Sequence, residues 1–338
     1  STMNRIYYFS RADLEKQLSF QEVITSVSDV YQAKAMHQTC SWPTVIHHFE
    51  ELSAVMDIKS GYDQPQSVYG MKILGTFPHN ARQGLPVFQG LLLIMDGNTG
   101  LPLALMDASY ITCMRTGAAG ALGVKLFSAD APQKLLVIGA GKQSIYQIAA
   151  SLLCCPSLTD IYVAALTLSE SDLFIESCRE QLISAFSIPA QKIHFHSVTV
   201  QDGLKECRSV ITVTPSRNPI VKKDWVLPGT HFSCIGADMP GKEELDPAII
   251  ASASVFTDDT AQCINAGEIE LPIKQGIFSP QQIRGEIGQV LTGQIKGRIS
   301  PEEMTIFDAT GLALLDIAVG KLVYTNSLKH GWDKYITL

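Results

Sequence analysis

The feature that most constrains this chain is the stretch LLVIGAGKQSIYQIAA, which runs from Leu135 to Ala150. An apolar run typical of a strand leads into Gly139-Ala140-Gly141-Lys142-Gln143-Ser144, and apolar residues at helical spacing follow. This is G-x-G-x-x-G with Ser in place of the third glycine. The first Gly permits a tight turn, the second lets backbone approach a pyrophosphate, and a small third residue suits close packing. We predict a dinucleotide site, with an empty strand–helix turn as the alternative.

From Lys134 onward, short apolar runs alternate with helical segments. This alternation is typical of a parallel sheet with crossover helices. The P-loop spacing G-x-x-x-x-G-K-[ST] is absent, which argues against phosphoryl transfer. The predicted strands are 135–138, 161–165, 193–198, 210–213, 231–235, 255–258 and 305–307, and a helix follows from Leu312 to about Val323.

The first third of the chain has a different pattern, with one amphipathic helix and then mostly strands. Residues 18–35 carry apolar positions at helical spacing. Asp96–Gly100 is rich in residues that accept positive φ, so it predicts a hairpin turn. The predicted strands are 42–48, 54–57, 69–76, 87–95 and 101–106, and an Ala/Gly-rich helix suited to close packing follows at 114–126.

The composition narrows the partners and the compartment. The formal charge of −7 and pI near 5.6 argue against a nucleic-acid or anionic-membrane partner, and no apolar run is long enough to predict a membrane span. The eight cysteines form no C-x-x-C pair, and most lie in apolar stretches, so we predict reduced core residues of a cytoplasmic protein. Ser1-Thr2 before Met3 is interpreted as a cloning remnant. No metal site is predicted, since His194 and His196 lack a further ligand set.

The end of the second predicted strand bears on the choice of cofactor. Enzymes that use NAD usually carry an acidic residue there, bonded to the ribose hydroxyls. Residues 163–169, VAALTLS, contain neither an acid nor an Arg. Thr167 or Ser169 could donate to a 2′-phosphate, so the sequence favours NADPH over NADH. Thr214, Lys142 and Gln143 are assigned to the same cofactor-binding set.

Charged residues outside the glycine loop suggest a site for an anionic substrate. Lys72 lies in the apolar strand YGMKILGTFPHN, and Arg115 lies in the Ala/Gly-rich CMRTGAAG. A charge in apolar surroundings needs a partner, either a structural carboxylate or an anionic ligand. Asp238 follows a predicted strand at the sheet edge where ligands bind, although it could simply form a turn or cap a helix. His79 is either a proton donor or a loop residue.

Together these segments resemble the ornithine cyclodeaminase/μ-crystallin family. The similarity covers nearly the whole chain and includes YGMKILGTFPHN, the Asp-Gly-x-Thr-Gly turn, MRTGAAGALG, VIGAGKQS, IGADMPGKEELD and FDATGLALLDIA. The resemblance implies an α/β fold, with a Rossmann-type doubly wound parallel sheet inserted into an α+β substrate and dimerisation domain. The expected domains are 1–125 with 310–338, for substrate binding and dimerisation, and 126–309, for the dinucleotide. The resemblance also implies that the protein is a homodimer.

The resemblance further implies roles for individual residues. Lys72 and Arg115 are similar to the residues that hold the substrate carboxylate, and Asp238 is similar to a catalytic aspartate that μ-crystallin lacks. Gly139, Gly141 and Ser144 would bind cofactor phosphates, and Asp308 and Gly311 would lie near the nicotinamide. Trp42, Thr44, Met56 and His79 complete the expected substrate-binding set.

Two departures from the family pattern affect the substrate. Many members carry a carboxylate-binding Arg where this chain has Pro43, and cyclodeaminases carry a Glu where it has Ala54. An ornithine ammonium buried without a partner would cost several kcal/mol. Glu50 or Glu51 could compensate in a gapped alignment. Pro43 and Trp42 would form an apolar wall suited to a ring.

The sequence therefore predicts an NAD(P)H-dependent reductase of a C=N bond next to a carboxylate, forming an L-amino acid. Cyclic ketimines such as pyrroline-2-carboxylate and piperideine-2-carboxylate, or the imine of a 2-oxo acid, are the expected substrates. Asp238 would act as general acid. The alternatives are an ornithine or lysine cyclodeaminase, which is an NAD-dependent lyase, and a non-catalytic ligand-binding protein like μ-crystallin.

Overall fold

A computed structural model describes residues 5–338, so the predicted remnant Ser1-Thr2 before Met3 lies outside the described residues. The chain divides into two compact units. The first unit ends at Arg115 and resumes at Leu312, and the second spans Thr116–Gly311. The first boundary falls inside one continuous helix, α3 (Ala108–Phe127), and not at residue 125 as the sequence suggested. The roles of the two units in substrate binding and dimerisation stay predictions.

The first unit is built on a mixed sheet in the order β16-β1-β7-β6-β5-β4-β2, with β3 also paired to β4. β1 pairs with β7 in parallel, and the other pairs are antiparallel. The predicted strand 54–57 extends to residue 63. The predicted strand 42–48 is wrong at its start, because strands occupy 39–41 and 45–49 with residues 42–44 between them, and the first and last strands were not predicted. The strands are β1 (Arg5–Phe9), β2 (Thr39–Ser41), β3 (Val45–Phe49), β4 (Ala54–Asp63), β5 (Val68–Thr76), β6 (Phe88–Asp96), β7 (Pro102–Asp107) and β16 (Tyr335–Thr337).

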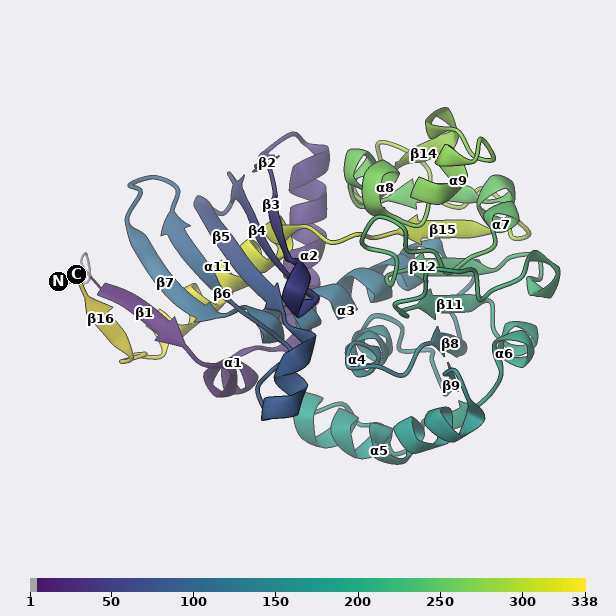
Figure 1. The fold of residues 1–338 in the computed structure, drawn as a ribbon, viewed down its shortest axis with the longest axis horizontal. Helices are drawn as coiled ribbons and strands as arrows, with labels where there is room; N and C mark the ends of the chain where they lie inside the picture. The colour runs from purple at the N-terminus through teal and green to yellow at the C-terminus, as the bar shows by residue number, and fades with distance from the viewer. Residues whose placement is uncertain (1–4) are drawn as a thin grey trace. The chain divides into compact units, whose positions relative to one another are not determined.

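One face of this sheet is covered by α11 (Ala313–Lys329), with α2 (Phe20–Ala35) packed beside it (Figure 1). Glycines in the strands let α11 approach closely: a Cβ on Gly61 would lie 3.0 Å from Leu314, and one on Gly70 would lie 3.3 Å from Ile317. The predicted hairpin turn joins β6 and β7, where the Asp96 carboxylate accepts from Asn98 N and Thr99 Oγ1. The remaining helical segments of this unit are α1 (Arg11–Gln17), η2 (Glu50–Leu52) and η3 (Pro78–Gln83).

The second unit contains a parallel sheet in the order β10-β9-β8-β11-β12-β15-β13-β14. From β10 to β12 this is the doubly wound dinucleotide-binding order, which reverses direction at β8. The predicted fold class is confirmed, and β14 is the strand that the sequence did not reveal. The strands are β8 (Lys134–Ile138), β9 (Asp160–Ala164), β10 (His194–Ser197), β11 (Ser209–Thr212), β12 (His231–Cys234), β13 (Ser254–Thr257), β14 (Ile283–Glu286) and β15 (Thr305–Asp308).

Helices pack along this sheet, with α4, α5 and α6 beside β8, β9 and β10 (Figure 1). The Ala/Gly-rich α3 packs closely, as predicted: a Cβ on Gly117 would lie 2.6 Å from the Tyr146 carbonyl oxygen. The helical segments are α4 (Ser144–Cys154), α5 (Leu168–Phe186), α6 (Val200–Glu206), η4 (Lys223–Trp225), α7 (Pro247–Ser252), α8 (Thr260–Ala266), α9 (Glu270–Lys274), η5 (Pro280–Gln282) and α10 (Ile287–Leu291).

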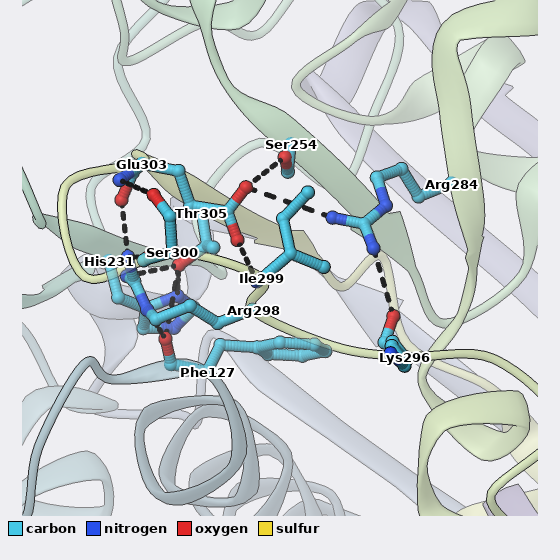
Figure 2. A network of polar contacts seen from close by, with 10 residues as sticks. All are labelled: Phe127, His231, Ser254, Arg284, Lys296, Arg298, Ile299, Ser300, Glu303 and Thr305. Carbon is cyan, nitrogen blue, oxygen red and sulfur yellow. Dashed lines mark hydrogen bonds and ion pairs between the residues drawn. The ribbon is translucent and has the colours of Figure 1, made fainter.

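The amino ends of β12 and β15 are held by a polar cluster around Arg298 (Figure 2). Arg298 donates from Nε to the carbonyl oxygen of Phe127 at 2.9 Å, from Nη1 to that of Ser300 at 3.1 Å, and from Nη2 to Thr305 Oγ1 at 3.1 Å. Every guanidinium nitrogen is therefore paired within the protein. His231 lies beside this cluster, where burial lowers its pKa to about 3, so it is a neutral structural residue.

The remaining composition-based expectations concern cysteines, membrane and metals. Cys154, Cys155, Cys178, Cys207, Cys234 and Cys263 are buried free thiols, as predicted, whereas Cys40 is exposed. Among residues 5–338, no helix combines the length and apolar character needed to cross a bilayer. Within the same residues, no three His, Cys, Asp or Glu side chains are grouped as metal ligands.

Candidate active site

Lys72 and Arg115, predicted from their apolar surroundings, meet in the first unit around one carboxylate. Lys72 Nζ lies 3.0 Å from Asp316 Oδ2 and 3.1 Å from Thr112 Oγ1. Arg115 Nε lies 3.1 Å from the same Asp316 oxygen, and Thr112 Oγ1 donates to Asp316 Oδ1 at 2.6 Å. All three charged side chains are buried. The structural carboxylate expected as one alternative is therefore present.

This cluster has more positive than negative charge. Two cations share one carboxylate, and Lys59 stands directly opposite Lys72 in the β4–β5 pairing. Burial lowers the pKa of Lys72 to about 8; Asp316 works against this shift, while Arg115 and Lys59 add to it. Burial alone would raise the pKa of Asp316, but Arg115 and Lys72 hold it below its usual value. The cluster is short of one anion.

The guanidinium of Arg115 is only partly used by the protein. Its Nε contacts Asp316, and among the described residues no acceptor pairs with Nη1 or Nη2. The terminal nitrogens of Arg suit the two oxygens of a carboxylate. The buried excess charge and these open donors together favour an anionic ligand.

Within residues 5–338, no hydrogen bond, ion pair or ring contact joins the other expected substrate residues of the first unit to this cluster. Met56 pairs with Gly75 across the β4–β5 ladder, whereas Lys72 pairs with Lys59. Because side chains alternate between the faces of a sheet, Met56 and Lys72 point to opposite faces. Trp42 contacts Tyr69, with ring centroids 6.0 Å apart. Thr44 lies in the segment between β2 and β3, and His79 lies in η3. Their roles stay predictions.

The second unit has a cavity of about 870 Å³ at the carboxyl ends of β8, β9 and β11. The strand order reverses between β8 and β11, which is where doubly wound sheets bind dinucleotides. Gly139, Gly141 and Thr214 line this cavity, and their binding of a cofactor stays a prediction. A Cβ on Gly141 would meet no atom within 4 Å, so open space borders the loop there. These features fit a dinucleotide.

The glycine loop explains why Ser144 replaces the third glycine. Gly139 has φ of +127°, and a Cβ there would lie 2.7 Å from the carbonyl oxygen of Val213. Ser144 is fully buried, and its Oγ donates to the Gly139 carbonyl oxygen at 2.9 Å, which closes the loop. Ser144 thus supports the loop from within. Lys142 is exposed on the loop, and the Gln143 side chain accepts from Gln147.

The end of β9 differs from the sequence-based picture in one respect. Ala165 and Leu166 follow the strand and line the cavity, and Leu166 is 93% exposed. Thr167 caps α5, with its Oγ1 accepting from Glu170 N at 3.1 Å. The Glu170 side chain lines the same cavity as Gly139. An acidic residue is therefore present near the strand end, one helical turn later than the sequence rule places it.

Asp238 lies in the exposed loop after β12 and forms an ion pair within the loop. Lys242 Nζ lies 3.0 Å from Asp238 Oδ1, and the Asp238 side chain is 48% exposed. The other carboxylate oxygen, Oδ2, has no protein partner among the described residues. The helix-capping alternative is not realised, because α7 is capped by Asp246.

Three glutamates hold this loop and connect it to the cofactor cavity. Glu270 Oε1 accepts from Gly241 N at 2.8 Å, and Glu268 Oε1 accepts from Glu244 N at 2.9 Å. Glu244 Oε2 in turn accepts from Thr214 N and Oγ1, both at 2.8 Å. Burial raises the pKa of Glu244 to about 7 and that of Glu268 well above its usual value. The loop of Asp238 and the cavity wall at Thr214 are thus parts of one hydrogen-bonded frame.

Asp308 is the last residue of β15, Gly311 lies in the segment that follows, and neither lines the cavity. Asp308 is fully buried, and burial together with Asp258 raises its pKa to about 8. Asp258 Oδ2 accepts from Gly311 N at 2.8 Å. These buried contacts hold the segment at the end of β15 in place. That Asp308 and Gly311 lie near a nicotinamide stays a prediction.

The residues that sequence reasoning missed are Asp316, Glu244 and Glu170. Asp316 had a readable signal, because it is a lone acid in the apolar stretch LALLDIA, the same context that singled out Lys72. Glu244 and Glu170 lie in polar segments, where the sequence offers no reason to separate them from neighbouring acids.

Comparison with known proteins places the chain in a family. The model of the ornithine cyclodeaminase/mu-crystallin family matches residues 7–331. The chain belongs to this family. The alanine dehydrogenase of Archaeoglobus fulgidus is 34% identical over 321 residues, covering 94% of each chain. The iminosuccinate reductase of Paracoccus denitrificans is 30% identical over 300 residues, covering 88% of this chain and 89% of the relative.

Solved structures of this family have the same fold over their full length. An archaeal alanine dehydrogenase dimer with bound NAD superposes with a TM-score of 0.89 at 30% identity, covering 99% of both chains. The Δ1-pyrroline-2-carboxylate reductase of Thermococcus litoralis, in complex with NADH and L-proline, gives 0.88 at 27% identity, covering 98% of this chain and 100% of the other. The predicted resemblance and the prediction of a nicotinamide-dependent oxidoreductase are confirmed.

Proposed function

We propose that this protein reduces a C=N bond next to a carboxylate with NADH or NADPH and forms an L-amino acid. The observation that carries the proposal is the buried Lys72–Arg115–Asp316 cluster, which is short of one anion. A substrate carboxylate supplies that anion. Cyclic ketimines such as pyrroline-2-carboxylate and piperideine-2-carboxylate, and imines of 2-oxo acids, are the substrate class.

Arg115 and Lys72 orient the substrate in this reaction. The terminal nitrogens of Arg115 grip the carboxylate, and the Lys72 ammonium adds charge beside it. Fixing the carboxylate fixes the neighbouring imine carbon, and orientation of this kind contributes several kcal/mol to lowering a barrier. A reduced nicotinamide, when bound in the cavity of the second unit, supplies the hydride.

Asp238 delivers the proton that the imine nitrogen gains. As hydride adds to carbon, the C=N π electrons move to nitrogen and form the N–H bond with a proton from the carboxylic acid form of Asp238, directly or through water; Asp238 is left as carboxylate beside Lys242 and regains a proton from solvent. Lys242 occupies Oδ1, which leaves Oδ2 for the substrate. The frame of Glu270, Glu268 and Glu244 keeps this loop in place.

A panel of substrates tests the proposal. Consumption of NADH and of NADPH is followed with pyrroline-2-carboxylate, piperideine-2-carboxylate, and pyruvate with ammonia or methylamine. We expect turnover with at least one imine and an L-amino acid as product. Conversion of ornithine to proline and ammonia with no net change in cofactor, and no imine reduction, would show a cyclodeaminase instead. Tight ligand binding without any hydride transfer would show a binding protein.

The open face of the first-unit sheet supports a homodimer. The register aligns Val45, Ile58, Ile73 and Leu91 in one row across β3, β4, β5 and β6, on the face opposite Lys72. Val45, Ile73 and Leu91 are each more than a third exposed. A row of exposed aliphatic side chains suits a second copy of the chain, and the archaeal relative is a dimer.

Light scattering on the purified protein tests the dimer. We expect twice the chain mass for the wild type and for Met36→Glu, an exposed control outside this row. Ile73→Asp, in the middle of the row, is expected to shift the mass toward the single chain. A wild-type protein of single-chain mass would refute the dimer.

The predicted cytoplasmic location stays a prediction.

A further inference from the structure

Among residues 5–338, Glu170 is the one ionisable residue that lines the cofactor cavity. The cavity at Gly139 adjoins a second pocket of about 320 Å³, and both are lined by Ala165, Leu166, Val200 and Ile220. Within residues 5–338, the other residues lining either pocket are apolar, glycine, proline, hydroxyl or amide residues. No Lys, Arg or His of the described chain lines either one.

Glu170 occupies the position at which a helix favours an anion. It is in the first turn of the long helix α5, whose N-cap is Thr167. Unpaired N–H groups and the helix dipole stabilise negative charge there. Since the Glu170 carboxylate already sits in this turn and on the cavity wall, a second anion at the same place would be repelled.

We propose that Glu170 makes this protein select NADH over NADPH, by accepting a hydrogen bond from the adenosine ribose and repelling a 2′-phosphate. The inference rests on the proposed cofactor cavity and not on the substrate. The sequence favoured NADPH because no acid follows β9 directly. The fold brings an acid back to that edge from the first turn of the next helix.

Lys222 lies near these pockets, and its influence on cofactor preference must be distinguished from that of Glu170. Lys222 Nζ lies 5.3 Å from the ring centroid of Trp225, and Trp225 lines the second pocket. If Lys222 reached a 2′-phosphate, it would favour NADPH. Its removal is therefore part of the test.

Dissociation constants of NADH and NADPH, measured by nicotinamide fluorescence on the whole protein without substrate, test the inference. We expect the wild type to bind NADH at least about tenfold more tightly, because the Glu170 carboxylate and a 2′-phosphate are like charges that would lie close together in the cavity wall. Glu170→Gln removes the charge and keeps the shape. It should lower the ratio of the NADPH dissociation constant to the NADH dissociation constant roughly tenfold, mainly by tightening NADPH binding. Leu166→Arg supplies a cation beside the cavity and should lower this ratio further.

The controls come from the same region. Glu176→Gln removes a charge from an exposed position of α5 that lines neither pocket, and the ratio should not change. Lys222→Ala should also leave the ratio unchanged. Tighter wild-type binding of NADPH, or equal ratios in Glu170→Gln and Glu176→Gln, would overturn the inference. If the expected ratios are found but no imine is reduced, the proposed function fails and this inference stands.

Discussion

Two arginines in this protein, Arg298 and Arg115, show how a structural cation differs from one available for a ligand. Arg298 has all three guanidinium nitrogens paired with carbonyl and hydroxyl oxygens of its own unit (Figure 2). Arg115 is more deeply buried, yet it contacts protein through Nε, and no acceptor within residues 5–338 pairs with its other two nitrogens. Burial alone therefore does not identify a functional charge. What favours a ligand at Arg115 is the pair of nitrogens that find no acceptor in the described part of the chain, together with the excess positive charge around it.

The largest expected effect follows from removing the shared carboxylate of the Arg115 cluster. Asp316→Ala leaves Lys72 and Arg115 buried without their counter-charge. Breaking such a buried pair costs about 3–5 kcal/mol, which we expect in the free energy of unfolding measured with denaturant. Asp333→Asn, an exposed change in the same unit, is the control and should be nearly neutral. A loss for Asp316→Ala no larger than the control's would show that the cluster is not a linked charge system.

A substitution of Arg298 should lower stability without a selective effect on substrate. Arg298→Met removes the hydrogen bonds to the carbonyl oxygen of Phe127 and to Thr305 Oγ1 and leaves these partly buried acceptors without that donor. We expect the free energy of unfolding to fall by roughly 2–4 kcal/mol. The substrate KM of the folded variant should stay within about twofold of the wild type, since no proposed ligand contact changes. A selective rise in KM would contradict the structural role given to Arg298.

The matching substitution at Arg115 should act mainly on the substrate. Arg115→Ala removes two charge-assisted hydrogen bonds to the substrate carboxylate, so we expect kcat/KM for the imine to fall about 100-fold, chiefly through KM. Arg115→Lys should recover part of this loss, because the charge remains but the two-pronged geometry does not. The dissociation constant of the cofactor should not change. If kcat/KM is unchanged, Arg115 does not bind the substrate.

The smallest effect is a dependence on pH that arises from Lys72. Because its pKa is lowered from 10.5 to about 8 in the folded protein, Lys72 is charged below about 8 and neutral above. We expect kcat/KM to fall above pH 8 as the carboxylate loses one cation. Stability changes in the opposite direction. The cost of burying the charge is present below pH 8 and is relieved between 8 and 10.5. In Lys72→Met, both trends should disappear.

The sequence predicted the fold where local pattern and tertiary structure agree. The glycine loop, the alternation after Lys134 and the Ala/Gly-rich helix are confirmed, because each is encoded by residues close in sequence. β1 and β16 were missed because their partners are distant in sequence. β1 pairs with β7, about a hundred residues later, and β16 pairs with β1 at the other end of the chain. β14 is a short, half-buried edge strand with two charged residues, which gives little apolar signal.

The site was predictable to the extent that single residues are anomalous in their own segment. Lys72 and Arg115 were visible as charges among apolar residues, and the same reasoning reaches Asp316. Which acid each cation contacts, and that Met56 points to the opposite face from Lys72, depends on strand register. Glu170 illustrates the remaining limit: its place in the cavity wall is set by how α5 leaves β9, which a rule about strand ends does not include.

Transfer of hydrogen from the cofactor to carbon tests the central claim most directly. Pyrroline-2-carboxylate and piperideine-2-carboxylate are incubated with the protein and with reduced nicotinamide cofactor that carries deuterium at both C4 positions. If the protein is an imine reductase, the L-amino acid formed carries one deuterium at C2, in amounts equal to the cofactor consumed. Unlabelled product, or no product from any imine while ornithine yields proline and ammonia, would contradict the account.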